Sequence, residues 1–179
     1  MGRDKALMPF SPDSDSQTLG QSAARAVAEA AGSAVLVGYP DRYRSLGYPV
    51  IPDLYPGEGP LGGILTALTH TAAEWNLVTA CDMPSLTAGP LRSLLDAAID
   101  LEADILIPEN PQGGLEPLCA VYRKQALGRL DAAFRSGTRK VAEAAAGVPR
   151  LRRIPFPASQ VSLFQNVNTP DEWAAHGTK

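Results

Sequence analysis

The chain has 179 residues, of which 45% are hydrophobic and 20% are charged, which is ordinary for a globular protein. This length suits one domain with a full hydrophobic core, so neither disulfides nor a structural metal is needed for stability. The net charge of −3, without any extended basic patch, argues against nucleic acid as the main partner. No apolar run approaches the roughly 18 residues of a membrane span, so we expect no membrane partner.

The two cysteines, Cys81 and Cys119, lie far apart in the sequence and each has apolar neighbours. This pattern is typical of reduced core cysteines in a cytosolic protein rather than of a disulfide. The first ten residues lack the apolar segment of a signal peptide. We therefore expect a cytoplasmic protein.

The amino-terminal region begins with a charged segment. Residues 2–5, Gly-Arg-Asp-Lys, predict a flexible loop, and a plain solvated tail is the alternative interpretation. Residues 11–18 are polar and show no periodicity, so they also predict a loop. Apolar residues at helical spacing then predict a helix from Leu19 that ends at Gly32.

Short apolar runs alternate with amphipathic patterns along the rest of the chain. The runs predict strands at residues 34–37, 49–52, 77–81 and 103–108, and two glycines at 113–114 break the chain before the stretch at 115–122. The amphipathic patterns predict helices at residues 61–68, 91–98, 124–135 and 139–146, followed by an extended segment at 161–167 and a terminal helix from Thr169. This alternation predicts a three-layer α/β/α domain with a mostly parallel sheet.

A carboxylate follows the central strand. Residues 77–81 are almost entirely apolar and predict a strand buried on both faces. Asp82 comes directly after them, and Pro84 prevents the strand from continuing. Ligands gather at the carboxyl ends of strands in open α/β sheets, where a carboxylate can hold a divalent cation on a phosphate. The alternative is that Asp82 only caps the following turn or helix.

A glycine-rich loop precedes one of the predicted helices. Residues 56–63, Pro-Gly-Glu-Gly-Pro-Leu-Gly-Gly, include four glycines and two prolines. Such a loop can aim backbone N–H groups and the helix dipole at an anion or a base. It is neither a P-loop nor a dinucleotide fingerprint, and a plain surface loop is the alternative.

Five separated stretches resemble one family, the molybdenum cofactor guanylyltransferases, which are nucleotidyltransferases. The stretches are Met-Gly-Arg-Asp-Lys-Ala-Leu at 1–7, Asp53 with Gly-Pro-Leu-Gly-Gly-Ile at 59–64, Ala-Cys-Asp-Met-Pro at 80–84, Glu-Pro-Leu-Cys-Ala-Val-Tyr at 116–122, and Asn-Val-Asn-Thr-Pro at 166–170. They occur in the expected order, and the third and fifth are the most specific. The resemblance implies a Rossmann-like nucleotidyltransferase domain that spans residues 1–179.

The resemblance implies a reaction and its partners. GMP would be transferred from GTP to the terminal phosphate of molybdopterin, with release of pyrophosphate and with Mg²⁺ as cofactor. Other cofactor-biosynthesis proteins and molybdoenzymes are further candidate partners. A related nucleotidyltransferase that uses CTP or a sugar phosphate, and a non-catalytic homologue that binds the cofactor, are the alternatives.

The resemblance also assigns catalytic roles by position. Arg3 and Lys5 would neutralise the triphosphate, and Asp82 would hold Mg²⁺. Phosphoryl-type transfer depends mainly on in-line positioning and on stabilisation of charge, which two cations and a metal can supply.

The remaining implied residues bind the substrates. Guanine would be read by Asp53 and by the backbone of Gly59, Pro60 and Leu61. Molybdopterin would be positioned by Asn166 and Asn168, with Arg139 and Lys140 as weaker phosphate candidates. Asparagine amides suit this role because they donate and accept hydrogen bonds without adding charge beside anionic substrates. Turn formation before the terminal helix is the alternative role for the two asparagines.

The resemblance is incomplete at the start of the chain. In the family, Met-Gly-x-Asp-Lys is the second half of a longer signature, which begins with a buried strand and a Leu-Ala-Gly-Gly-x-Ser-x-Arg loop. That strand would be central in the sheet, and its loop would cradle the phosphates. A start codon assigned too late, a shortened sequence and a degenerate relative are the three explanations. We therefore expect a domain truncated at its amino terminus, with weak GTP binding or no activity and with unpaired apolar surface.

Overall fold

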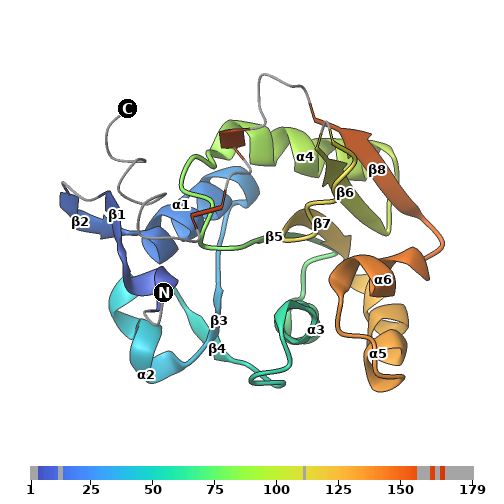
Figure 1. Ribbon diagram of the computed structural model, residues 1–179, viewed down its shortest axis with the longest axis horizontal. Coiled ribbons are helices and arrows are strands. Elements are labelled where there is room, and N and C mark those ends of the chain that lie inside the picture. Colours follow the sequence, from blue (N-terminus) through green and yellow to red (C-terminus); the bar gives the residue numbers. More distant parts are fainter. Residues whose placement is uncertain (1–3, 12–13, 111, 157–161, 164–165, 168–179) are drawn as a thin grey trace.

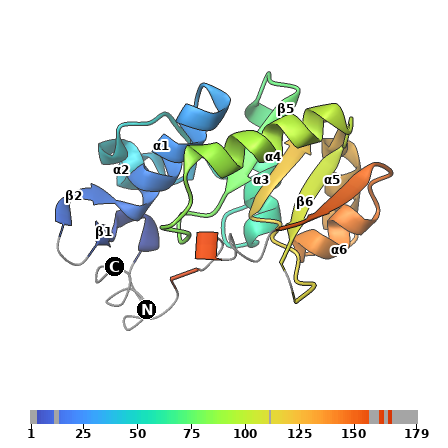
Figure 2. The ribbon, with the colours of Figure 1, turned by 90° about the horizontal axis from the view of Figure 1, so that it is seen from above.

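A computed structural model describes residues 4–11, 14–110, 112–156, 162–163 and 166–167, in which helices lie on both sides of a layer of strands (Figure 1). One side is covered by α1 (Leu19–Ala31) and α4 (Ala88–Asp100), which lie side by side (Figure 2). The other side is covered by α3 (Pro60–His70), α5 (Leu127–Arg135) and α6 (Val141–Ala146). The three-layer α/β/α architecture expected from the sequence is therefore confirmed.

The described strands form three separate hydrogen-bonded sheets. Two are pairs: β1 (Pro9–Ser11) with β2 (Ser14–Thr18), and β3 (Leu36–Gly38) with β4 (Val50–Pro52). The third has the order β5-β7-β6-β8, made by Trp75–Thr79, Cys119–Arg123, Ile105–Glu109 and Leu151–Pro155.

The largest sheet is more mixed than the sequence suggested. β6 runs parallel to β8, and β3 runs parallel to β4, but β7 is antiparallel to both of its neighbours. β6 and β7 follow each other along the chain without an intervening helix. A short connection suits antiparallel neighbours, whereas parallel neighbours need a crossover of a dozen or more residues, usually a helix.

The two central strands, β6 and β7, supply side chains to both faces of the sheet. Ile105 and Tyr122 belong to the core beneath α3, α5 and α6, whereas Leu106 and Val121 belong to the core beneath α4. All four side chains are completely buried. Because side chains alternate between the two faces of a strand, burial on both faces requires the continuous apolar runs that the sequence shows.

The strand before Asp82 differs from its prediction in position and in burial. β5 spans Trp75–Thr79 rather than residues 77–81, and all five of its side chains are partly exposed. The expected burial on both faces is wrong for the described structure. The reason is that β5 is the end strand of its sheet and pairs with β7 alone.

Two strands, β2 and β8, were not predicted from the sequence. The predicted loop at residues 11–18 contains β2, which pairs antiparallel with β1. Its backbone pairing needs no apolar pattern, so the polar sequence gave no signal. β8 was not predicted, because two arginines interrupt its apolar residues. The predicted terminal helix from Thr169 lies outside the described residues, as do residues 161, 164 and 165 of the predicted extended segment at 161–167. Residues 162–163 of that segment form a helical turn, so the expectation of extended structure is wrong there.

The remaining helical segments are short: η1 (Lys5–Leu7), α2 (Pro40–Tyr43), η2 (Arg44–Leu46) and η3 (Lys124–Ala126). Lys124 in η3 stabilises the end of α3, because its Nζ donates to the carbonyl oxygens of Leu68 at 2.6 Å and Thr71 at 2.7 Å. A cation at the carboxyl end of a helix also interacts favourably with the helix dipole. Within the described residues, every helix is too short or too polar to span a lipid bilayer.

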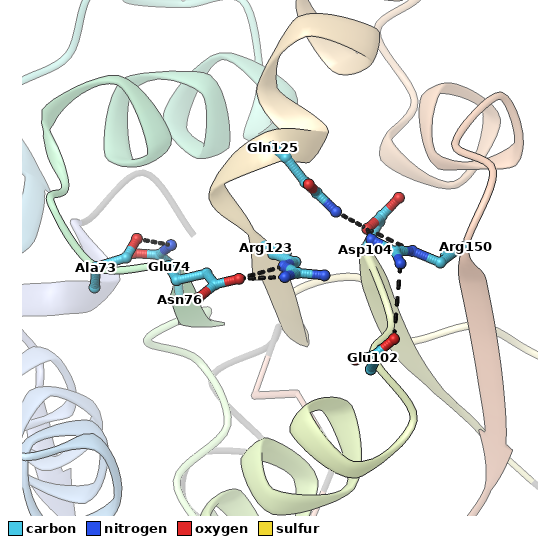
Figure 3. Close-up of polar contacts among 8 residues, drawn as sticks. All are labelled: Ala73, Glu74, Asn76, Glu102, Asp104, Arg123, Gln125 and Arg150. Carbon is cyan, nitrogen blue, oxygen red and sulfur yellow. Dashed lines mark hydrogen bonds and ion pairs between the residues drawn. The ribbon is translucent and has the colours of Figure 1, made fainter.

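A buried aspartate joins three strands at one end of the sheet (Figure 3). Asp104 Oδ1 accepts hydrogen bonds from Arg150 Nη2 at 2.8 Å, from Arg150 Nε at 3.1 Å and from Gln125 Nε2. The backbone of Asp104 also bonds to Arg150, just before β8, and to Arg123 at the end of β7. Glu74 adds an ion pair with Arg123 beside this cluster (Figure 3). These contacts fix where β6 begins relative to β7 and β8.

Charge and hydrogen bonding determine the protonation of Asp104. Burial raises its pKa, but the hydrogen bonds from Arg150 and Gln125 outweigh burial, so the pKa lies below the ordinary value of 3.8. The unfolded chain therefore binds this proton at a higher pH than the folded chain does. The ionised aspartate contributes stability above pH 3.8, and this contribution is lost as the pH falls through the lower folded pKa.

We expect Asp104→Ala to lower the free energy of unfolding by about 2 kcal/mol at neutral pH, because it removes the acceptor of a charged hydrogen-bonded cluster. The difference from wild type should shrink as the pH falls below 3.8, and urea unfolding at several pH values measures it. Asp100→Ala, at an exposed position at the end of α4, is the control and should change stability by less than about 0.5 kcal/mol. An Asp104→Ala cost that stays constant from neutral to acid pH would contradict this account.

Candidate functional site

Lys5 and Asp82 form an ion pair beyond the carboxyl end of β5. Lys5 Nζ lies 2.8 Å from Asp82 Oδ2, and the two side chains are 28% and 18% exposed. The amino-terminal segment is therefore ordered at this point, and the expectation of a flexible loop is wrong for Asp4 and Lys5. The sequence placed both residues of the pair in the candidate site, and the structure brings them into direct contact.

One oxygen of Asp82 has no hydrogen-bond donor. Among the described residues, Asp82 Oδ1 is a buried side-chain atom without a partner. A buried acceptor that lacks a donor is unfavourable by about 1–3 kcal/mol, so such atoms often mark the place of a ligand or ion. The pair is therefore half satisfied: Oδ2 is held by Lys5, and Oδ1 is available to another group.

This arrangement fits a magnesium ion better than a metal held by protein alone. The described residues contain no group of three or more His, Cys, Asp or Glu side chains around one point. Mg²⁺ is commonly bound by one or two carboxylates together with water and substrate phosphates. Asp82 Oδ1 could supply the one protein ligand that such a site needs, while Lys5 could contact phosphate oxygens beside it.

The segment that carries Lys5 is held in place by its neighbour Asp4. Asp4 Oδ2 accepts hydrogen bonds from Tyr43 Oη at 2.8 Å and from Arg42 Nη1 at 3.2 Å. Asp4 Oδ1 accepts from the backbone N–H of Ala6 and caps η1. The anchoring role of Arg42 and Tyr43 has no signal in the sequence, because both lie in a short polar segment and reach Asp4 across almost forty residues of chain.

Residues 166–167 also reach Asp82. The backbone N–H of Val167 donates to the carbonyl oxygen of Asp82 at 2.8 Å, and Val167 is buried. This contact places Asn166 near the Lys5–Asp82 pair, and Asn166 itself is exposed. Arg3 and Asn168 lie outside the described residues, so their roles stay predictions.

The glycine-rich loop opens α3 as the sequence predicted. Gly59 caps the helix with φ 81° and ψ −174°, a conformation that L side chains rarely adopt, and Pro60 is the first helical residue. Both residues are exposed, whereas Leu61 is completely buried beneath the helix. Gly62 allows close packing, because a Cβ there would lie 2.8 Å from the Cβ of Tyr55. The backbone of the loop can therefore approach a ligand while Leu61 anchors it.

Asp53 is tied to α3. Its Oδ1 accepts hydrogen bonds from Thr66 Oγ1 at 2.9 Å and from the backbone N–H of Tyr55 at 3.0 Å. Thr66 Oγ1 in turn accepts from the N–H of Leu54. The carboxylate is thus fixed between the end of β4 and the glycine-rich loop.

The two weaker phosphate candidates are engaged elsewhere in this structure. Arg139 Nε lies 2.6 Å from Glu58 Oε2, and its guanidinium lies 4.1 Å from the ring centroid of Phe134. Lys140 pairs with Glu143 at 3.0 Å on an exposed surface. Arg139 therefore joins the glycine-rich loop to the α5–α6 connection, and its part in phosphate binding stays a prediction.

The cysteines near the site are protonated thiols. Burial raises the pKa of Cys81 to about 11, with the neighbouring Asp82 charge adding to the effect. Burial likewise raises the pKa of Cys119 to about 12. Both are free, as the sequence predicted, and neither has the lowered pKa of a nucleophilic thiol.

Comparisons with known proteins cover the part of the chain that carries Lys5, Asp53 and Asp82. A family model described as "MobA-like NTP transferase domain" matches residues 1–150. Proteins named "Probable molybdenum cofactor guanylyltransferase" are similar: that of Clostridium perfringens is 32% identical over 145 residues, covering 78% of this chain and 72% of its own. That of Deinococcus radiodurans is 34% identical over 148 residues, covering 78% and 70%. The crystal structure of molybdopterin-guanine dinucleotide biosynthesis protein A from Archaeoglobus fulgidus superposes with a TM-score of 0.68 at 28% identity, covering 79% of this chain and 75% of that one.

The hydroxyl of Tyr43 provides a test of how the Lys5 segment is anchored. Burial, with its hydrogen bond to Asp4, raises the pKa of Tyr43 to about 12 from the ordinary 10.0. The unfolded chain loses this proton first, so the stability that Tyr43 contributes is complete below pH 10 and is lost as the pH approaches 12.

We expect Tyr43→Phe to lower the free energy of unfolding by about 1 kcal/mol at neutral pH, because Asp4 loses a donor. The tyrosinate absorbance of the variant should lack the component that titrates near pH 12 in the wild type. Tyr48→Phe is the matched control and should leave that component in place. Burial raises the pKa of Tyr122 further, so its later titration remains in both variants. If the component near pH 12 survives in Tyr43→Phe, the assignment is wrong.

Proposed function

Because the chain belongs to the MobA-like NTP transferase domain family, we propose that it transfers the GMP group of GTP to the terminal phosphate of molybdopterin. The product is molybdopterin guanine dinucleotide, and pyrophosphate is released. The similarity to relatives named molybdenum cofactor guanylyltransferase supports the reaction. The observation that carries its mechanism is the Lys5–Asp82 pair, in which one buried carboxylate oxygen has no partner within the described part of the chain.

In the proposed reaction, an oxygen of the molybdopterin phosphate attacks the α-phosphorus of GTP. A new phosphorus–oxygen bond forms while the bond from the α-phosphorus to the leaving pyrophosphate oxygen breaks, so the pyrophosphate carries away that electron pair. Little covalent chemistry is asked of the protein, whose task is to align the two oxygens and to stabilise negative charge. Lys5, held by its bond to Asp82, is oriented to contact phosphate oxygens.

A bound Mg²⁺ would neutralise the phosphates on which charge develops during transfer. Asp82 would hold it through Oδ1, and Arg3 would add a second cation from the same terminal segment. The exposed amide of Asn166, close to Asp82, would contact the molybdopterin side together with Asn168. The proposal includes Mg²⁺ as the cofactor and GTP and molybdopterin as the substrates.

Guanine recognition is proposed for the opening of α3. Asp53 is fixed by Thr66 and Tyr55, so its carboxylate can be presented to a base without a loss of side-chain freedom. The exposed backbone of Gly59 and Pro60 lies next to it along the same loop, with Leu61 as the buried anchor. A cytoplasmic location is also part of the proposal, and the two free cysteines support it.

Asp82→Asn tests the metal-binding role. We expect this change to reduce dinucleotide formation at least about a hundredfold, because an amide cannot replace the carboxylate charge on a cation. The measurement is product formation from GTP and molybdopterin with Mg²⁺ in the full-length protein, and Asp100→Asn on the surface is the charge-matched control. Wild-type rates in Asp82→Asn would remove Asp82 from the mechanism.

Nucleotide selectivity can be measured independently of turnover. With Mg²⁺ present, we expect GTP to raise the Tm by about 3 °C and CTP by clearly less, because the proposal assigns guanine recognition to the Asp53 and Gly59 region. The matched readout is the same titration without Mg²⁺, in which both shifts should fall. A larger response to CTP would support a cytidylyltransferase instead.

A further inference from the structure

Glu58 lies in the glycine-rich loop between two glycines that have positive φ. Gly57 has φ 82° and Gly59 has φ 81°. Because glycine allows the backbone many conformations, a loop of this composition keeps one of them only where other contacts hold it. Two backbone hydrogen bonds lie within the segment, from Glu58 N–H to the carbonyl oxygen of Tyr55 and from Gly62 N–H to that of Gly59, both at 3.1 Å. Both bonds are local, so neither holds the loop against the rest of the fold.

The loop is held against α5 at three successive places. At its start, the rings of Tyr55 and Phe134 pack with their centroids 4.8 Å apart and their planes at 58°. In its middle, Glu58 Oε2 lies 2.6 Å from Arg139 Nε. At its end, Leu61 belongs to the same buried core cluster as Phe134. Since α3 packs beside α5 (Figure 1), these contacts position the loop relative to the neighbouring helix.

Arg139 is itself fixed on the α5 side of this contact. Its guanidinium carbon lies 4.1 Å from the ring centroid of Phe134. Its Nη1 donates to the carbonyl oxygen of Phe134 at 2.8 Å and to that of Thr138 at 3.2 Å. A planar guanidinium can stack on a ring and donate in several directions at once, which a lysine ammonium cannot do. Arg139 therefore presents Nε to Glu58 from a defined position.

We propose that Glu58 and Arg139 are positioning residues for nucleotide binding. Their ion pair holds the glycine-rich loop in the conformation that presents the backbone of Gly59 and Pro60 to the base, and neither side chain touches the nucleotide. This inference rests on the guanine-recognition role proposed above for the opening of α3, and it adds the contact that prepares the loop for that role.

The expected effect of losing the ion pair is on binding rather than on global stability. The two side chains are 48% and 43% exposed, and an ion pair that is this exposed contributes little to the stability of the whole fold. Without the pair the loop adopts further conformations. The apparent affinity for the nucleotide then falls with the fraction of molecules that keep the binding conformation.

The first experiment measures the loop without any ligand. Glu58→Ala and Arg139→Met each remove the ion pair, and hydrogen exchange followed by mass spectrometry compares residues 54–63 in the variants and in the wild type. After correction for intrinsic rates, exchange should be at least about threefold faster in both variants, because the loop opens more often. Arg135→Gln breaks the exposed Arg135–Asp131 pair at the end of the same helix, and this matched control should leave exchange of the loop unchanged.

The second experiment separates the base from the phosphates. Calorimetric titrations of the full-length protein with Mg²⁺ use two ligands, GTP and inorganic triphosphate, which has no base. Each variant should bind GTP about fivefold more weakly and should bind triphosphate as the wild type does. The double variant should be no weaker toward GTP than either single variant, because the two residues act through one contact. Arg135→Gln should bind both ligands as the wild type does.

Several results would overturn the inference. Unchanged exchange of the loop in both variants would show that the ion pair does not hold it. Unchanged GTP affinity beside faster exchange would show that the loop conformation does not limit binding. Weaker triphosphate binding in Arg139→Met, with an effect on GTP that adds to that of Glu58→Ala, would make Arg139 a direct phosphate ligand.

Failure of the proposed function gives a different result. If the wild-type protein binds no GTP, or binds CTP more tightly, guanine recognition by this loop is wrong, and the exchange experiment still decides whether the ion pair holds the loop. Thermal unfolding checks that the variants are folded. If Arg139→Met does not fold, Glu58→Ala decides alone, because Glu58 lies on an exposed loop outside the core.

Discussion

The segment η1 is the element on which the site depends, because it ties two separately hydrogen-bonded parts of the molecule together. Asp4 binds Arg42 and Tyr43 beside the β3–β4 pair, and the next residue, Lys5, binds Asp82 beside the larger sheet. In the described residues no hydrogen-bonded ladder joins these two sheets. Two adjacent charged side chains therefore fix how the carboxyl ends of β3 and β5 face each other, and they do so at the place where α/β proteins bind ligands.

Much of the fold could be predicted because its signals are local. The helix that ends at Gly32, the helix opened by Pro60 and the apolar run of β6 all follow from periodicity and terminal residues. β2 and β8 could not be predicted in this way, because their stability comes from pairing with neighbours rather than from an apolar pattern. The burial of β5 was overestimated for a related reason, since burial depends on which strands lie beside it and the sequence alone does not give them.

In the candidate site, too, the residues in known motifs could be predicted from the sequence, whereas the contacts between distant residues could not. Lys5 and Asp82 were identified from their motifs, and their contact across 77 residues is a property of the fold alone. The anchoring role of Tyr43 gave no sequence signal, because a tyrosine in a polar segment is ordinary until its partner is known. The resemblance predicts that Asp53 reads the base, which stays a prediction, and the structure adds that Thr66 and Tyr55 hold the carboxylate in place.

Asp82 and Asp104 show how the surroundings of an aspartate separate a structural role from a chemical one. Asp104 lies at the amino end of β6, where Arg150 and Gln125 direct their donors at one of its oxygens, and the cluster holds three strands in register. Asp82 follows the carboxyl end of β5, where Lys5 satisfies one oxygen and no residue that the structure describes donates to the other, which is buried. Folding alone would favour a satisfied carboxylate at both ends. At Asp82, an unsatisfied carboxylate oxygen lies beside the ammonium group of Lys5, which is carried on a long side chain. This arrangement is the one expected where a metal ion and a phosphate are bound together.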